Sequence, residues 1–262
     1  MVDEIIGNLE KKVQELEIER QTFQNLVETE RKKSISLTAR TLPKHAADLV
    51  AAGKPVDPCE YKGVSVLSAN VTGLDALAND MTATEMAVFL DDFGAKVNEI
   101  IATTTAIKIE QNGAYYLMAD GIPNSSFETA IETVNLAMEM INCVCQYKVQ
   151  VKACKEALGL KCGIHIGTVI ASVAGTDTLH YSVVGEAVGI AKKLEHLAGN
   201  CEILISNDFK IVVDRSGQKF NIEKKPNEEA IRNEPDHKEP IFCIKPRENS
   251  SPTSVEVPDV EI

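Results

Sequence analysis

His165 is the residue whose type and setting best suit general-base chemistry, because an imidazole titrates near neutral pH. It lies at the centre of Gly163-Ile164-His165-Ile166-Gly167, within a strand pattern. A catalytic histidine needs a nucleophile or an orienting carboxylate within reach, and no Ser, Cys or carboxylate in the sequence is clearly paired with it. We therefore interpret His165 as structural. The remaining histidines also lack the spacing of metal ligands; they are His45, His180, His196 and His237.

Thiol and carboxylate clusters give no stronger indication of a metal site. Cys143 and Cys145 are the closest pair among seven cysteines, but they fall in a helical pattern without a matching Cys or His pair. Core or surface thiols are therefore the favoured interpretation. Asp91 and Asp92 are more simply explained as a solvated helix face.

The composition is that of one globular domain with extensions. Hydrophobic residues make up 44% of the 262 residues and charged residues 25%. The net charge of −12 argues against nucleic acid or an anionic membrane as a partner. No apolar run reaches the roughly 18 residues of a membrane-spanning helix, and the N-terminus lacks the regions of a signal peptide. Seven cysteines without an export signal indicate reduced thiols, so we expect a cytoplasmic protein.

Residues 1–40 have the periodicity of one helix. The segment is strongly charged outside its apolar stripe, which favours a coiled coil, with a parallel dimer as the expected form. The alternative is an amphipathic helix packed against its own domain. Leu42-Pro43 ends the helix, because proline lacks the backbone donor. The stripe consists of Ile6, Leu9, Val13, Leu16, Phe23, Val27 and Leu37.

The domain over residues 41–246 alternates strand and helix patterns from about residue 60, as an α+β domain does. A capping box at Thr82 and Glu85 opens a helix that runs to about residue 104. Asn112-Gly113 is the expected turn of a hairpin. Further helices are expected over 126–157 and 186–198, and strands over 64–72, 106–111, 114–119, 160–166, 169–174, 181–184, 202–206, 219–223 and 241–245. Residues 224–239 suggest a loop, and the acidic tail over 247–262 is expected to be disordered.

Four segments of the chain, spanning about residues 41–210, resemble the class III nucleotide cyclases and are most similar to their guanylate-cyclase-like branch. Any one would be a weak signal, but four in this order behind a coiled-coil pattern are specific. They are Leu42-Pro43-Lys44-His45 through Gly53-Lys54-Pro55-Val56, the strand over 64–74, the hairpin over 108–123, and the stretch from Gly163 to Val188.

The resemblance implies the ferredoxin-like nucleotide cyclase fold, an α+β fold with a central mixed sheet and flanking helices. It also implies a homodimer, or a heterodimer with another cyclase-like chain, formed through the coiled coil and a face of the cyclase domain. In the family each active site is shared between chains. One chain supplies two metal-binding aspartates, and the other supplies a transition-state asparagine and arginine.

The positions of the two metal-binding aspartates hold Asn70 and Ala114. Two Mg²⁺ ions held close together need hard, anionic oxygen ligands, which an amide and a methyl group do not provide. We therefore expect no metal cofactor, with Mg²⁺ or Mn²⁺ present only alongside residual nucleotide binding.

The positions of the transition-state residues have also changed. Gly189 stands where the family has the asparagine, and Lys193 where it has the arginine. A lysine keeps the charge but lacks the forked guanidinium geometry. Asp75 adds a negative charge where the family has a small hydroxyl residue beside the triphosphate. Lys224 and Lys225 lack the glycine pattern of the family's phosphate-contacting segment.

Two positions remain as candidates for nucleotide binding. Glu110 matches the residue that reads the guanine edge in guanylate cyclases. Its partner position holds Ser182, which is neither the aspartate of adenylate cyclases nor the cysteine of guanylate cyclases. We interpret Glu110 as a mark of ancestry in preference to current guanine binding.

The replacements together predict a catalytically inactive cyclase-like domain. It would act as a dimeric structural or regulatory partner in cyclic-nucleotide-related signalling or in a larger assembly. One alternative is a weak guanylate or adenylate cyclase that converts a nucleoside triphosphate to a cyclic nucleotide and pyrophosphate. Another is a non-catalytic nucleotide-binding module. A last alternative discards the family and takes the chain as an ordinary α+β interaction domain on a coiled coil.

Overall fold

A computed structural model describes residues 2–150, 158–175, 179–226 and 239–245. The chain forms two compact units. The first comprises residues 1–58 and 172–182, and the second comprises residues 59–171 and 183–262. In the described part of the chain, no helix has the length and apolar character needed to cross a membrane.

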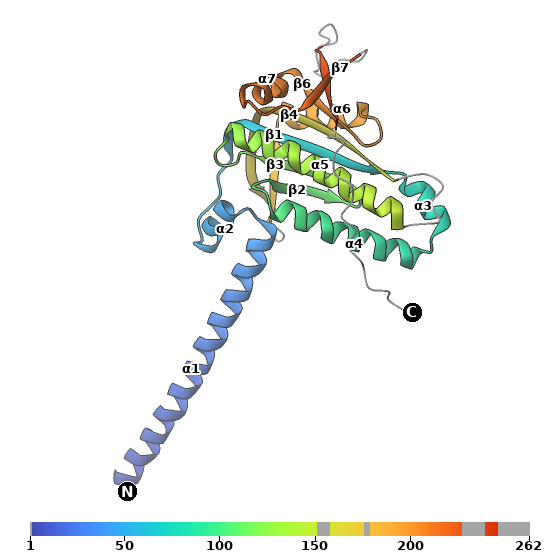
Figure 1. Ribbon diagram of the computed structural model, residues 1–262. Helices are drawn as coiled ribbons and strands as arrows, with labels where there is room; N and C mark the ends of the chain where they lie inside the picture. The colour runs from blue at the N-terminus through green and yellow to red at the C-terminus, as the bar shows by residue number, and fades with distance from the viewer. Residues whose placement is uncertain (1, 151–157, 176–178, 227–238, 246–262) are drawn as a thin grey trace. The chain divides into compact units, whose positions relative to one another are not determined.

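The N-terminal segment of the first unit is a long helix, α1 (Val2–Thr41), which confirms the helix predicted over 1–40 (Figure 1). It ends directly before Leu42-Pro43, as expected. Its apolar stripe is uncovered in the single chain, because no described side chain from residue 6 to residue 37 is buried. The exposed fractions are 48% for Ile6, 53% for Val13, 52% for Leu16, 66% for Phe23, 64% for Val27 and 62% for Leu37.

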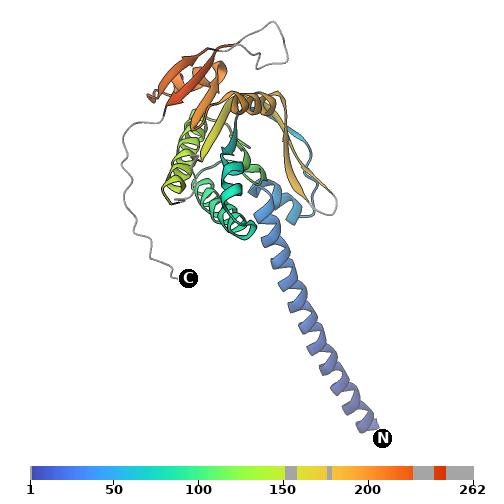
Figure 2. The same ribbon diagram turned by 90° about the vertical axis from the view of Figure 1, so that its right-hand side faces the viewer.

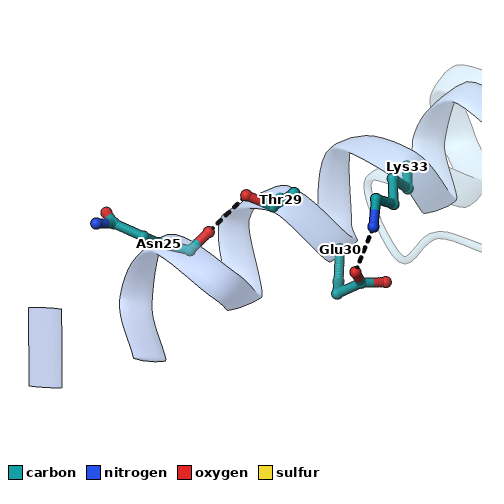
Figure 3. A network of polar contacts seen from close by, with 4 residues as sticks. All are labelled: Asn25, Thr29, Glu30 and Lys33. Carbon is teal, nitrogen blue, oxygen red and sulfur yellow. Dashed lines mark hydrogen bonds and ion pairs between the residues drawn. The ribbon is translucent and has the colours of Figure 1, made fainter. Parts of the chain in front are cut away.

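The polar side chains of α1 bond within the helix itself. The Thr29 hydroxyl donates to the Asn25 carbonyl at 2.8 Å, and the Lys33 ammonium pairs with the Glu30 carboxylate at 2.8 Å (Figure 3). Exposed pairs of this kind contribute about 0.2–0.5 kcal/mol each to a helix. They support the helix locally, and the coiled coil remains a prediction.

A second helix, α2 (Lys44–Ala51), lies where the sequence predicted only a joining segment. It buries Ala46 and Ala47 and presents His45 to Tyr181. Tyr181 lies in the part of strand β5 (His180–Val184) that belongs to the same unit. The His45 Nε2 is 3.0 Å from the Tyr181 hydroxyl, and burial lowers the pKa of His45. A neutral imidazole is therefore favoured in this contact.

The second unit is built on a mixed sheet, as predicted for an α+β fold. Its order is β2-β3-β1-β4-β6-β8-β7, with β5 paired to β4 outside this path. The pairing of β4 with β6 is parallel, and the other pairings in this order are antiparallel. The strands are β1 (Cys59–Thr72), β2 (Ile107–Asn112), β3 (Tyr115–Asp120), β4 (Gly159–Ala174), β6 (Glu202–Ser206), β7 (Asn221–Lys225) and β8 (Ile241–Lys245).

Helices pack on both faces of this sheet because its strands alternate apolar side chains between the faces. On one face, Ile203 and Ile205 of β6 join the large core formed with α4 (Ala83–Ala102), α5 (Phe127–Gln150) and α7 (Asn207–Arg215). On the other face, Leu204 packs with Leu194 of α6 (Glu186–Leu197). Figures 1 and 2 both show α4 and α5 running side by side along the sheet. A short helix, α3 (Leu74–Asp80), follows β1.

Three of the predicted strands were wrong in their bounds by more than two residues. The strands expected over 160–166 and 169–174 are one strand, β4, because its ladder with β1 continues through Gly167, which pairs with Val64. β1 begins at Cys59, before the expected residue 64. Its register against β4 shifts between Tyr61 and Val64, as at a β-bulge.

The hairpin prediction was wrong by one residue at its turn. Asn112 pairs with Tyr115, so the two turn residues are Gly113 and Ala114 and not Asn112 and Gly113. Gly113 has φ +58°, the left-handed region that glycine adopts without steric cost. Ala114 therefore lies in the turn and not in β3, where the sequence predicted it.

Helices α3 and α7 were not predicted, since both are short and follow strands without a break. Ser206 caps α7 by accepting from the Phe209 N–H. The capping box of Thr82 and Glu85 is confirmed at the start of α4. β7 includes Lys224 and Lys225, which were assigned to a loop. The predictions for residues 151–157, 227–238 and the tail over 247–262 lie outside the described residues.

Candidate functional site

The fold brings Asn70 and Ala114 to the same end of two neighbouring strands. Asn70 pairs with Tyr115 in the ladder between β1 and β3, and the next N–H, of Val71, donates to the Ala114 carbonyl at 3.1 Å. The two positions are therefore backbone neighbours, although the Ala114 methyl packs against the core shared with α4 and α5 while the Asn70 amide faces α6. Their side chains are an amide and a methyl group.

The Asn70 amide is bonded to a carboxylate. Its partner is Glu195 of α6, which is 8% exposed. Burial raises the pKa of Glu195, and the hydrogen bond from Asn70 opposes this change together with the charges of His196, Lys161 and Lys192. Asn70 therefore serves as a hydrogen-bond donor to a buried acid on the neighbouring helix.

These residues do not fit a two-metal site. Ala114 provides no ligand, and the Asn70 amide is engaged with Glu195. Within the described ranges, no group of three or more His, Cys, Asp or Glu side chains could hold a metal ion. Two divalent cations need several anionic oxygens in common, and this arrangement does not provide them.

Glu110, the candidate base-reading residue, is paired with a lysine of α6. The Lys192 ammonium lies 3.6 Å from the Glu110 carboxylate and 5.3 Å from the centre of the Tyr115 ring. Burial alone would lower the pKa of Lys192, but the Tyr115 hydroxyl and the Glu110 carboxylate hold it above its ordinary value. Both members of the pair are about half exposed. The Glu110 carboxylate is thus already bound to a cation.

The other candidate positions lie on three elements. Gly189 and Lys193 are four residues apart on α6 and share a helix face; Gly189 is exposed and Lys193 half-buried. A Cβ at Gly189 would meet nothing within 4 Å. Ser182 is half-buried in β5, and Asp75 is exposed in the first turn of α3.

His165 has a partner that sequence reasoning did not find. Its Nδ1 lies 2.7 Å from the Ser206 hydroxyl, and that hydroxyl also caps α7. Both residues are enclosed, with His165 3% exposed and Ser206 0%. The prediction that no serine pairs with His165 was therefore wrong. The two residues are far apart in the sequence and meet only because β4 and β6 lie side by side. The burial agrees with a structural role.

Sequence reasoning also missed Glu195, Lys192 and Tyr115, which fill the site. Lys192 and Glu195 lie three residues apart on α6, a spacing that places them on one face. That spacing does not show that Glu195 meets Asn70 or that Lys192 meets Glu110. It also does not show that the Lys192 ammonium lies over the Tyr115 ring. These contacts depend on how α6 packs on the sheet.

Comparison with known proteins identifies the class of this domain. The family described as "Adenylate and Guanylate cyclase catalytic domain" matches residues 56–245. The chain belongs to this family, which removes the alternative of an unrelated α+β interaction domain. The receptor-type guanylate cyclase Gyc76C of Drosophila melanogaster is 27% identical over 226 residues, covering 86% of this chain and 15% of that protein. The receptor-type guanylate cyclase gcy-13 of Caenorhabditis elegans is 27% identical over 219 residues, covering 80% of this chain and 21% of that protein.

Solved structures confirm the nucleotide cyclase fold. The guanylate cyclase domain of RhGC from Catenaria anguillulae in complex with GTP matches with a TM-score of 0.62 and 22% identity, over 71% of this chain and 98% of that one. The adenylyl cyclase CyaB from P. aeruginosa matches with a TM-score of 0.62 and 17% identity, over 74% of this chain and all of that one. The chain spans about a fifth or less of the length of the two receptor-type relatives above.

The contact between Asn70 and Glu195 gives a stability prediction for Asn70→Asp. The substitution replaces a donor with a second carboxylate beside a buried acid, so we expect a loss of about 1–3 kcal/mol at pH 8 in EDTA. The pair would share a proton at lower pH. Its folded pKa is thus raised, and the loss should shrink as the pH falls towards 5. Urea denaturation at both pH values measures this.

The matched control is the double variant Asn70→Asp, Glu195→Gln. It restores a donor beside the new carboxylate, so its stability at pH 8 should recover most of the loss. A single Asn70→Asp variant as stable as the wild type at pH 8 would contradict the contact.

Proposed function

We propose that this chain is a catalytically inactive member of the cyclase family that acts as a dimeric structural or regulatory partner in cyclic-nucleotide-related signalling or a larger assembly. The observation that carries the proposal is the chemistry of two neighbouring positions, 70 and 114. They lie side by side, yet one is an amide bonded to Glu195 and the other a methyl group. A cyclization that depends on two bound cations has no ligands there.

The ion pair of Lys192 and Glu110 supports the same conclusion for the nucleotide base. A guanine edge would have to compete with an ammonium group for the Glu110 carboxylate. Such half-exposed pairs are individually weak, so the pair disfavours binding without excluding a ligand of high affinity. We therefore favour a domain that does not hold a nucleotide.

The exposed stripe of α1 supports dimerisation. Apolar side chains at coiled-coil spacing are stabilised when a second helix covers them. A solved guanylyl cyclase domain, that of the RhoGC fusion protein from Blastocladiella emersonii, is described as a non-canonical dimer.

The described cysteines are free thiols, which supports a cytoplasmic location.

The direct test is cyclic nucleotide formation by the purified chain, with GTP and ATP in turn and excess Mn²⁺. An active guanylate cyclase domain serves as the positive control. We expect no product above the blank and no change in melting temperature with either nucleotide. Turnover would overturn the proposal in favour of a weak cyclase. Stabilisation by nucleotide without turnover would replace it with a nucleotide-binding module.

A regulatory role predicts inhibition in a mixed dimer. The family's shared sites imply that one site would lack both aspartates and the other would lack the asparagine and arginine. Purified heterodimers with an active guanylate cyclase domain should therefore have no measurable turnover. A heterodimer with near-normal turnover would contradict this role.

A further inference from the structure

Asp120, the last residue of β3, is a buried carboxyl group outside the site described above. It is 2% exposed. Its Oδ1 accepts from the Gly121 N–H at 2.9 Å and lies 2.7 Å from the Thr105 hydroxyl. Its Oδ2 is also buried and has no hydrogen-bond partner. A buried, unpartnered oxygen on an ionised carboxylate is strongly unfavourable, so the charge state of Asp120 needs an explanation.

The Thr105 hydroxyl lies between two carboxyl groups. Its Oγ1 is 2.7 Å from Asp120 Oδ1 and 2.8 Å from Glu132 Oε2 of α5. A hydroxyl carries one hydrogen and can donate it fully to one acceptor. A hydrogen from one of the carboxyl groups would satisfy the second short oxygen–oxygen contact. Asp120 is the enclosed member of the cluster, whereas Thr105 is exposed and Glu132 half-buried.

We propose that Asp120, Thr105 and Glu132 form a proton-binding site, in which Asp120 is protonated on Oδ1 and donates to Thr105, while Thr105 donates to Glu132 Oε2. Every short contact then has one hydrogen. The unpartnered Oδ2 becomes the carbonyl oxygen of a neutral acid, whose burial is far less unfavourable than that of a charged oxygen. The ligand of this site is a proton. The inference does not depend on the proposed function.

The surroundings of Asp120 favour the protonated form. Burial raises its pKa; the bonds from Thr105 and the Gly121 N–H lower it, and the negative charge of Glu132 raises it further. Among the described residues, Glu132 is the charged group that acts on Asp120. Lys108, on the adjacent strand β2, is held by Asn98 and Gln111 and does not neutralise the site.

The site joins three parts of the second unit: the segment before β2, the end of β3, and α5. Because the folded state holds the proton to a higher pH than the unfolded chain, its stabilisation is complete below the ordinary carboxyl pKa of 3.8. It is lost as the pH rises through the folded value. Above that value, two carboxylates face one hydroxyl, and the junction weakens.

Thermal denaturation between pH 5 and pH 8, in EDTA, tests the site. The wild type should lose melting temperature as the pH rises, and Asp120→Asn should remove about 2–4 °C of that loss, since an amide cannot ionise. Glu132→Gln should act in the same direction, because it removes the negative charge that raises the pKa of Asp120. The matched control is Asp91→Asn, at an exposed carboxylate, which should follow the wild type.

A direct readout completes the test. Below the folded pKa of Asp120, the infrared absorption of a protonated carboxyl group should be present in the wild type and lost in Asp120→Asn. Identical pH profiles for the wild type and both variants would overturn the proposal. So would stabilisation by Ca²⁺ or Mg²⁺ that Asp120→Asn abolishes, because the cluster would then bind a cation. If Asp120→Asn fails to fold, the profile of Glu132→Gln decides.

Discussion

Cyclase turnover is expected from a variant with four substitutions, and from neither pair of them alone. The first pair is Asn70→Asp with Ala114→Asp, and the second is Gly189→Asn with Lys193→Arg. Losing an arginine or an oriented donor in such chemistry costs on the order of 10²–10⁵ in rate. Each pair alone should therefore stay at the blank in a Mn²⁺-dependent assay of cyclic GMP formation, while the four together give measurable product.

The structure offers space for this experiment. Positions 70 and 114 are already backbone neighbours at the same end of β1 and β3. An added side chain at Gly189 meets nothing within 4 Å, and Lys193 lies on the same face of α6. The lysine at position 192 would still pair with Glu110. Lys192→Ser in the four-substitution background should therefore lower the KM for GTP.

Mixing the two paired variants tests the shared site. Dimers that combine the aspartates of one chain with the asparagine and arginine of the other contain one complete site. Random pairing should give roughly a quarter of the turnover of the four-substitution homodimer. Product from the Asn70→Asp, Ala114→Asp pair alone would show that Gly189 and Lys193 are not the missing half.

Gly163→Ala is expected to give the largest loss of stability. Gly163 lies on β4 directly beneath α6, where an added Cβ would overlap the Glu195 nitrogen and the Ala191 carbonyl oxygen and lie 2.8 Å from the Leu194 carbonyl carbon. These are backbone atoms, so the whole helix would have to move. We expect a loss of about 3 kcal/mol or more, corresponding to roughly 6–12 °C in melting temperature.

Gly189→Ala, on the helix α6 that packs over Gly163, is the matched control. Its Cβ would meet open space, and alanine is a better helix former than glycine. We expect a gain of about 0.5–1 kcal/mol. Circular dichroism melting curves compare the two variants. A Gly163→Ala protein as stable as the wild type would show that α6 does not lie against β4 at this glycine.

Local sequence signals predicted the elements that local chemistry defines. The capping box of Thr82 and Glu85 opens α4 because its two hydrogen bonds form within four residues. Leu42-Pro43 ends α1 for an equally local reason. The bounds of β4 were not predictable in this way. Its continuity through Gly167 depends on the ladder with β1, which lies far away in the sequence.

The short helices show the same limit. α2, α3 and α7 have fewer than ten residues each, too short for a clear apolar period. α7 is stabilised by packing of Phe209 and Val213 into the core and by its Ser206 cap. The sequence shows these residues without showing the core that receives them.

The sequence by itself determined which atoms stand at the family's functional positions, because residue type fixes side-chain chemistry. Asn70 and Ala114 bring no carboxylate, and Gly189 and Lys193 bring no carboxamide or guanidinium, in any conformation. Only the tertiary structure decided what these residues and their neighbours do instead. Asn70 bonds to Glu195, Glu110 pairs with Lys192, and Asp120 meets Thr105 and Glu132. Each of these contacts joins separate elements, and hydrogen bonds and ion pairs depend on distances that only packing sets.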